Sequence, residues 1–265
     1  AMSKILLTNG CSYTGGHDNI HDSQGNLNPP ADYTWPNRLL LKNSLENYEV
    51  TNIAIGGNSN DKILRRTIEH IEKNKVDAVI VQWTAMHRKE LYFQPLGEWG
   101  NLCNHYELED PLDKALTTDS AFADKNMYAM HFDKNVEYDE SVLNIVDKIT
   151  RSASTDYFWQ YSETDYIVQY FQKILVLQSY LESKNIPYVF TSMGSSSHLP
   201  LMVNKIGLTT DYEKILASQI NLNKWTKRPL TYIAMYDLDE TKHPTVKGHT
   251  MIAKETTKEF NRING

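Results

Sequence analysis

The residues best suited to chemistry follow short apolar segments that predict buried strands. Ser12 lies in the run 10–14, directly after the apolar segment 4–9, and His243 follows the acidic run 237–240. A serine that attacks, a histidine that takes its proton and a carboxylate that orients the imidazole are the parts of acyl transfer, with N–H donors holding the oxyanion. The sequence therefore predicts Ser12 as a nucleophile and His243 as its general base.

Two nearby residues are rivals for these roles. Cys11 is the chemical rival, since a thiolate is the better nucleophile, but no fixed cation adjoins it in the sequence, which favours a buried small apolar residue. His249 is the rival base, and its place about one and a half helical turns after His243 predicts a position on a helix surface. Ser12 and His243 are therefore the preferred pair.

Five apolar segments predict the strands that position these residues: 4–9, 50–55, 78–83, 187–192 and 230–235. Helical periodicity fills the intervals, which indicates a parallel sheet with right-handed crossovers. The predicted fold class is α/β, a three-layer α/β/α sandwich with a five-stranded parallel sheet. The site of such a sheet lies outside the carboxyl ends of its strands, where the polar runs described above begin.

Three helices are predicted from apolar residues at helical spacing. Asn58 or Ser59 can cap the first of them, directly after the second strand. The second covers about 164–185 and ends there because Pro187 cannot continue it. The third begins at about Val246.

The segment 97–161 interrupts the alternation of strands and helices. It holds ten aromatic residues, and its acidic residues outnumber the basic ones by 13 to five. A structureless loop of this length is uncommon inside a compact domain. We therefore predict that 1–265 is a single domain in which 97–161 forms an inserted cap of short helices, packed over the carboxyl edge of the sheet beside Ser12 and His243.

Composition and charge exclude several classes of protein. Hydrophobic residues make up 40% and charged residues 23% of the chain, which excludes a disordered protein. A net charge of −6 without a run of Lys and Arg argues against nucleic-acid binding. No apolar run approaches the roughly 18 residues of a membrane span, and the apolar stretch 5–7 is too short for a signal peptide. Two cysteines give no disulfide framework, so a reduced, cytoplasmic protein is expected.

The sequence runs around Ser12 and His243 resemble the SGNH (GDSL-type) hydrolase family. The first block of that family, Gly-Asp-Ser-x-Thr, is similar to Gly-Cys-Ser-Tyr-Thr at 10–14. The glycine of its second block resembles Gly57, and its last block resembles Glu-Thr-Lys-His-Pro at 240–244 with the Gly-His pair at 248–249. The resemblance follows the core in order and leaves only the insertion unmatched. It implies the flavodoxin-like SGNH hydrolase fold and an oxyanion hole made by the N–H groups of Ser12 and Gly57.

The acid that orients His243 is open among three carboxylates. Glu240 has the spacing of the family and is preferred, while Asp239 and Asp237 are close rivals. Asn58 either contacts substrate or caps the following helix, and capping is favoured.

Two blocks depart from the family pattern. Cys11 stands in place of the aspartate of the first block. The third block, Gly-x-Asn-Asp, falls at Gln82 to Thr84 and lacks the Asn that supplies an oxyanion donor in the family. Thr84, Gln82 or Arg88 could replace that donor. The form Gln-Trp-Thr-x3-Arg resembles uncharacterised members of the family from bacteriophage genomes, so no substrate can be transferred from the studied esterases.

A further run, His-Asp-x2-His-Asp at 17–22, has residue types that bind metals. It lies in a loop rich in Gly, Asn and Pro without a third fixed ligand, so a solvated loop is favoured over a metal site. Acyl transfer of this kind needs no metal or organic cofactor, and none is expected.

The predicted function is a serine esterase or deacetylase that hydrolyses an ester of a small or carbohydrate-like substrate. A catalytically inactive binding module of the same fold is the alternative, motivated by the missing Asn, and an acyltransferase would use the same site. No nucleic-acid or membrane partner is expected, and the sequence does not fix the acyl group, the alcohol or the oligomeric state. The predicted site comprises Ser12, His243, Glu240 and Asp239 as catalytic residues and Gly57, Asn58, Thr84 and Arg88 on the oxyanion and substrate side.

Overall fold

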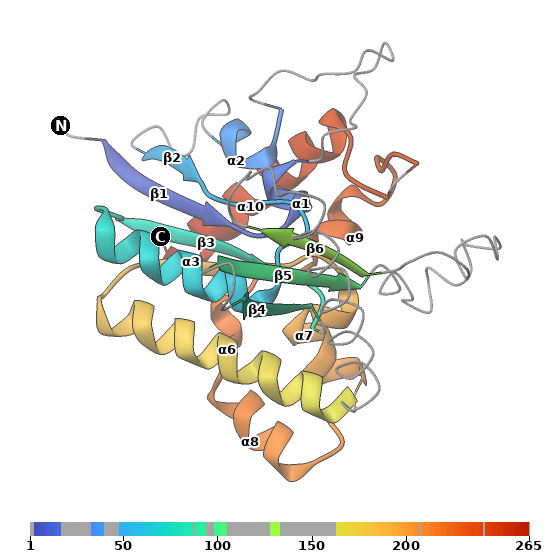
Figure 1. The fold of residues 1–265 in the computed structure, drawn as a ribbon. Coiled ribbons are helices and arrows are strands. Elements are labelled where there is room, and N and C mark those ends of the chain that lie inside the picture. Colours follow the sequence, from blue (N-terminus) through green and yellow to red (C-terminus); the bar gives the residue numbers. More distant parts are fainter. Residues whose placement is uncertain are drawn as a thin grey trace.

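The computed structural model of the chain has a parallel sheet of four strands at its centre (Figure 1). In the order β2-β1-β3-β7, these strands are Tyr48–Asn52, Lys4–Asn9, Ala78–Trp83 and Tyr188–Ser192. The structure describes residues 3–16, 33–39, 48–86, 88–93, 98–104, 128–132, 163–206, 208–240 and 242–264.

Helices cover both faces of this sheet, so the predicted α/β fold class is confirmed (Figure 1). Side chains alternate along each strand: Leu7 and Val79 face one layer of helices, and Leu6 and Ile80 face the other. The first layer consists of α3 (Asn60–Lys73), α6 (Glu163–Ser183) and α8 (Asp211–Gln219), and the second of α2 (Trp35–Arg38), α9 (Leu230–Ala234) and α10 (Val246–Asn264).

The remaining elements are short. They comprise α1 (Ser12–Gly15), η4 (Ser195–Ser197), α7 (Leu199–Leu201), the π-helical turn η5 (Met202–Ile206) and η6 (Leu222–Lys224). Among the described residues, no helix combines the length and the apolar composition needed to cross a membrane.

Three of the predicted helices are present with the expected signals. The hydroxyl of Ser59, rather than the side chain of Asn58, caps α3 by accepting the Lys62 N–H at 3.2 Å. α6 ends at Ser183, shortly before Pro187, and α10 begins at Val246 as predicted.

The predicted fifth strand, 230–235, is wrong, because these residues form α9. The β-branched residues of this segment favoured a strand, but Leu230, Ile233 and Ala234 recur at helical spacing and bury one face against the core. Beside β7, a single parallel bridge from Trp225 to Phe190 occupies the place of a fifth strand.

The second strand begins and ends earlier than predicted, at 48–52 instead of 50–55. The Asn52 side chain ends it, because its Oδ1 accepts both the Thr8 hydroxyl at 3.1 Å and the Ala54 N–H at 3.2 Å. This local bonding turns the backbone out of the ladder.

The insertion contains strands where short helices were predicted. Its strands β5 (Glu98–Asn104) and β6 (Tyr128–Phe132) form an antiparallel sheet with β4 (Lys89–Phe93), which precedes the insertion; the sheet is drawn in green in Figure 1. β4 lies against the first turns of α3, where Asp61 Oδ2 accepts the Glu90 N–H at 3.3 Å. The rest of 97–161 lies outside the described residues, so a cap over the site stays a prediction.

Candidate active site

Ser12 and His243 come together at the carboxyl edge of the central sheet. Ser12 is the first residue of α1, directly after β1, and His243 lies in the loop that joins α9 to α10. The Ser12 Oγ is 2.8 Å from His243 Nε2, the hydrogen-bond distance expected for a nucleophile and its base. β1 and β3 are neighbours in this sheet, and the order of the strands reverses between them, which is the topological switch point.

The loop that carries His243 is closed by its own backbone. Leu238 and Pro244 form an antiparallel bridge, and the Asp239 N–H donates to the His243 carbonyl at 2.8 Å. Lys242 has a φ of +64°, a left-handed conformation that costs a non-glycine residue about 1 kcal/mol or more. The surrounding bonds therefore hold a strained backbone directly before His243.

Tyr13 links the helix that carries Ser12 to the loop that carries His243. Its hydroxyl donates to the Lys242 carbonyl, and its ring centroid lies 5.6 Å from that of His243. Ser12 and Tyr13 are adjacent in α1, so one helical turn carries Ser12 and also contacts the loop of His243.

The three candidate acids have different surroundings. Asp239 contacts the backbone of His243, since its Oδ1 accepts the His243 backbone N–H at 3.0 Å. Glu240 is exposed. Asp237 forms an ion pair with Lys247 at 2.9 Å.

Amide side chains from the end of β2 and from the loop that follows it hold the turn of Ser12. Asn58 Nδ2 donates to the Gly10 carbonyl at 2.8 Å, and Asn52 Nδ2 donates to the Thr14 carbonyl at 3.1 Å. Asn58 is therefore fixed on the turn before Ser12, which differs from the capping role that the sequence favoured.

The turn after β2 passes directly beside the serine. A β-carbon added at Gly56 would lie 3.7 Å from Ser12 Cβ. Gly57 has a φ of +74°, a conformation that favours glycine. The predicted oxyanion residue Gly57 thus belongs to a turn in contact with Ser12.

Thr84 follows β3 at the position of the missing family Asn. Asn60 fixes its backbone by accepting the Thr84 N–H at 2.8 Å and donating to the Thr84 carbonyl at 3.0 Å. The Thr84 hydroxyl is buried and has no hydrogen-bond partner among the described residues. Arg88 lies nearby, with its Nη1 3.4 Å from the Asn58 carbonyl.

The two rival residues are both buried. Cys11 is fully buried, in agreement with its reading as a small apolar residue. The prediction that His249 lies on a helix surface is wrong, because its ring packs against Tyr33 and its Nδ1 accepts the Trp35 N–H at 3.3 Å. Burial, and then the nearby Arg38 cation, lowers the pKa of His249 to about 3.

The candidate metal run 17–22 lies outside the described residues. Within the part of the chain that the structure describes, no group of three or more His, Cys, Asp or Glu side chains could hold a metal ion.

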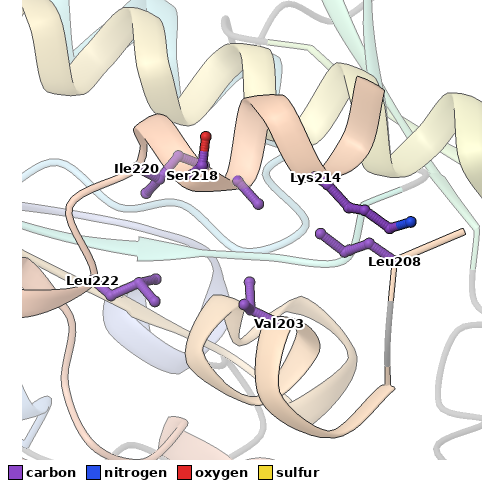
Figure 2. A pocket seen from close by; sticks show the side chains of 7 residues that line it. Val203, Leu208, Lys214, Ser218, Ile220 and Leu222 are labelled. Carbon is purple, nitrogen blue, oxygen red and sulfur yellow. The ribbon is translucent and has the colours of Figure 1, made fainter. Parts of the chain in front are cut away.

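A pocket of about 390 Å³ lies between η5 and α8 (Figure 2). Its lining is mainly apolar, and its charged member, Lys214, is 3.4 Å from Asp211. The pocket contains none of the residues around Ser12. Its lining residues are Val203, Leu208, Lys214, Ala217, Ser218, Ile220 and Leu222.

Comparison with known proteins finds similarity only among solved structures, since no protein-family model and no curated protein matches the chain. A psychrotrophic esterase, EstA, from Pseudoalteromonas sp. is 11% identical, with a TM-score of 0.47 over 98% of this chain and 97% of its own. A lipolytic protein of the G-D-S-L family from Veillonella parvula is 11% identical, with a TM-score of 0.43 over 97% of each chain. A catalytic mutant of the acetylxylan esterase Axe2 from Geobacillus stearothermophilus is 15% identical, with a TM-score of 0.44 over 98% and 95%. The structural neighbours of this chain thus include esterases at low identity.

Proposed function

We propose that this protein is a serine hydrolase of carboxylic esters, of the SGNH type, acting on a small or carbohydrate-like substrate. The observation that carries the proposal is the 2.8 Å contact between Ser12 Oγ and His243 Nε2 at the carboxyl edge of the sheet. The motif at 10–14 and the His-Pro pair at 243–244 supply the same two residues independently from the sequence. We assign the chain to the divergent, bacteriophage-type members because its pattern of Gln82 to Thr84 with Arg88 resembles theirs.

The reaction runs through an acyl-enzyme. Ser12 Oγ attacks the ester carbonyl while its proton passes to His243 Nε2, and the collapse of the tetrahedral intermediate expels the alcohol, which takes that proton. His243 then removes a proton from water, whose oxygen attacks the acyl carbon, and the second collapse returns the proton to Ser12. The products are the free alcohol and the carboxylic acid.

Asp239 is the acid that we assign to His243, in preference to Glu240. Its carboxylate already contacts the backbone of the base, whereas Glu240 is exposed. A carboxylate here stabilises the imidazolium that forms during each proton transfer.

The oxyanion is assigned to the N–H groups of Ser12 and Gly57, with the Thr84 hydroxyl as the third donor. Gly57 lies in the turn beside Ser12, and the buried Thr84 hydroxyl has no partner among the described residues. A hydroxyl in this state gains a hydrogen bond when an oxyanion forms next to it.

Hydrolysis of p-nitrophenyl acetate by the purified full chain tests the proposal. The Ser12→Ala and His243→Ala variants are expected to lose activity by a factor of about 1,000 or more, since either deletion disables the pair. A Cys11→Ala variant should keep most of the activity. Full activity of Ser12→Ala together with loss in Cys11→Ala would show that the serine mechanism is wrong.

The acid assignment has its own matched pair of variants. Asp239→Asn keeps an acceptor for the His243 N–H but removes the charge, so kcat should fall by about 100-fold or more. Glu240→Gln should remain within about twofold of the unmodified chain. The reverse result would transfer the role to Glu240.

A further inference from the structure

Gln82 joins the end of β3 to the turn that carries Ser12. Its Oε1 accepts the Cys11 N–H at 3.0 Å and the Thr14 hydroxyl at 2.9 Å. Its Nε2 donates to the Trp83 carbonyl at 2.8 Å and to Cys11 Sγ at 3.3 Å. The side chain is fully buried.

The turn needs such an external anchor because it cannot hold its own conformation. α1 has four residues, and no side chain caps its N-terminus. An isolated turn of this length is unstable, because the entropy lost in ordering the backbone of several residues outweighs its few hydrogen bonds. Anchors at Cys11 and Thr14 bracket Ser12, so together they set the direction in which Ser12 presents its Oγ and its N–H.

The sequence around Gln82 is adapted to this contact. A β-carbon at Gly10 would lie 2.6 Å from Gln82 Oε1, so only glycine leaves room for the amide. The third block of the SGNH pattern has glycine where this chain has Gln82, and a glycine has no side chain with which to make these bonds.

We propose that Gln82 is a positioning residue of the nucleophile, which holds Ser12 in register with His243 from the neighbouring strand. The inference rests on the proposed function. Gln82 acts through the turn and does not touch substrate, because the protein already engages both its acceptor and its donor. This also removes Gln82 from the three candidates for the missing oxyanion donor.

The test compares Gln82→Met with Gln178→Met in the full chain. Gln178 is also buried and links two elements far from the site, since it accepts the Asn221 N–H at 2.8 Å and donates to the Gln219 carbonyl at 3.1 Å. With p-nitrophenyl acetate, Gln82→Met should lower kcat by about 10- to 100-fold and leave KM within about threefold, because misplacement of a reacting group acts on the chemical step. Gln178→Met should lower Tm without changing kcat by more than about twofold.

Two further variants keep the inference testable if Gln82→Met fails to fold. Gln82→Glu retains an acceptor oxygen for the turn and should recover part of the lost kcat, and Thr14→Val deletes one of the anchored bonds and should lower kcat alone. A folded Gln82→Met or Thr14→Val protein with kcat within about twofold of the unmodified chain would overturn the inference. An active Ser12→Ala variant would instead overturn the proposed function, so the two failures are distinguishable.

Discussion

At the scale of single residues, we expect Tyr13 to fix the position of His243, the proposed base. Its hydroxyl is bonded to the carbonyl of the strained Lys242, next to His243. Tyr13→Phe removes this bond and keeps the ring, so we expect kcat/KM for p-nitrophenyl acetate to fall about tenfold as His243 loses its fixed position. Tyr188→Phe is the matched control, because it deletes a hydroxyl bonded to Glu182 away from the site. Equal activities in the two variants would refute the role of Tyr13.

Thr84 offers a residue-scale test in which activity and stability separate. Thr84→Val removes a buried hydroxyl without a partner among the described residues, so Tm should stay equal or rise by about 2–4 °C. If that hydroxyl is an oxyanion donor, kcat should fall by about 100-fold, while Thr84→Ser keeps the donor and most of the activity. Thermal unfolding and ester hydrolysis, measured on the same samples, distinguish an oxyanion donor from a structural residue. A fall in Tm with unchanged kcat would mean that Thr84 is structural.

At the scale of elements, an ion pair fastens the antiparallel sheet to the core. Arg65 on α3 binds both carboxylate oxygens of Glu90 on β4, at 2.7 and 3.0 Å, and the Glu90 side chain is 2% exposed. The Arg65 guanidinium also lies over the Trp99 ring of β5, 5.1 Å from its centroid. The sheet is therefore held to α3 by a largely desolvated charge pair.

Glu90→Gln should loosen this attachment. The change removes the carboxylate that Arg65 binds on β4 and leaves Arg65 with Glu69, 3.0 Å from its Nη1, so the free energy of unfolding should fall by about 1–3 kcal/mol. Hydrogen exchange should accelerate in β4 and β5 more than in β1 and β3. Uniform acceleration in all four strands would show that the pair stabilises the whole domain rather than the attachment of the sheet.

The elements also show what the sequence could predict. Continuous apolar runs predicted β1, β3 and β7, because a strand that is buried on both faces has apolar side chains at nearly every position. The segment 230–235 has the same composition, but its helical spacing against the core decides in favour of α9. Local patterns cannot reveal which face a short apolar segment will bury.

The candidate site could be predicted only in part, because some of its contacts join residues that lie far apart in the sequence. Ser12 and His243 carry a sequence motif, whereas Gln82 and Tyr13 act through contacts between residues 68 or more positions apart. A polar side chain at the end of the apolar run 78–83 was the single local signal for Gln82. His249 was misplaced because the residues that bury it, Tyr33 and Trp35, come from a distant part of the chain.

At the scale of the whole molecule, two buried histidines should make stability depend on pH. Burial lowers the pKa of His198 to about 4. The pKa of His249 is lowered to about 3, first by burial and then by Arg38 and His243, while Asp239 opposes this shift. In the unfolded chain both histidines bind a proton near pH 6.5. Their contribution to the free energy of unfolding is therefore complete above that pH and falls as the pH drops towards 4 and 3. The loss should be up to about 1.4 kcal/mol per pH unit for each histidine.

Denaturant unfolding between pH 7.5 and 4 measures this dependence. His249→Gln should flatten the slope below pH 6.5, because glutamine does not titrate. The His249 ring faces the Tyr33 ring and the Trp35 N–H, so some stability should be lost at every pH. An unchanged slope in the variant would show that His249 is not held neutral in the folded state.

The central claim is that Ser12 is a nucleophile activated by His243, and covalent labelling tests it most directly. A fluorophosphonate reacts with such a serine by forming an Oγ–P bond and releasing fluoride. The intact chain should gain the mass of one phosphonyl group, peptide mapping should place it on Ser12, and the His243→Ala variant should react about 100-fold or more slowly. No mass gain, or a label on another residue while Ser12 stays unmodified, would contradict the account.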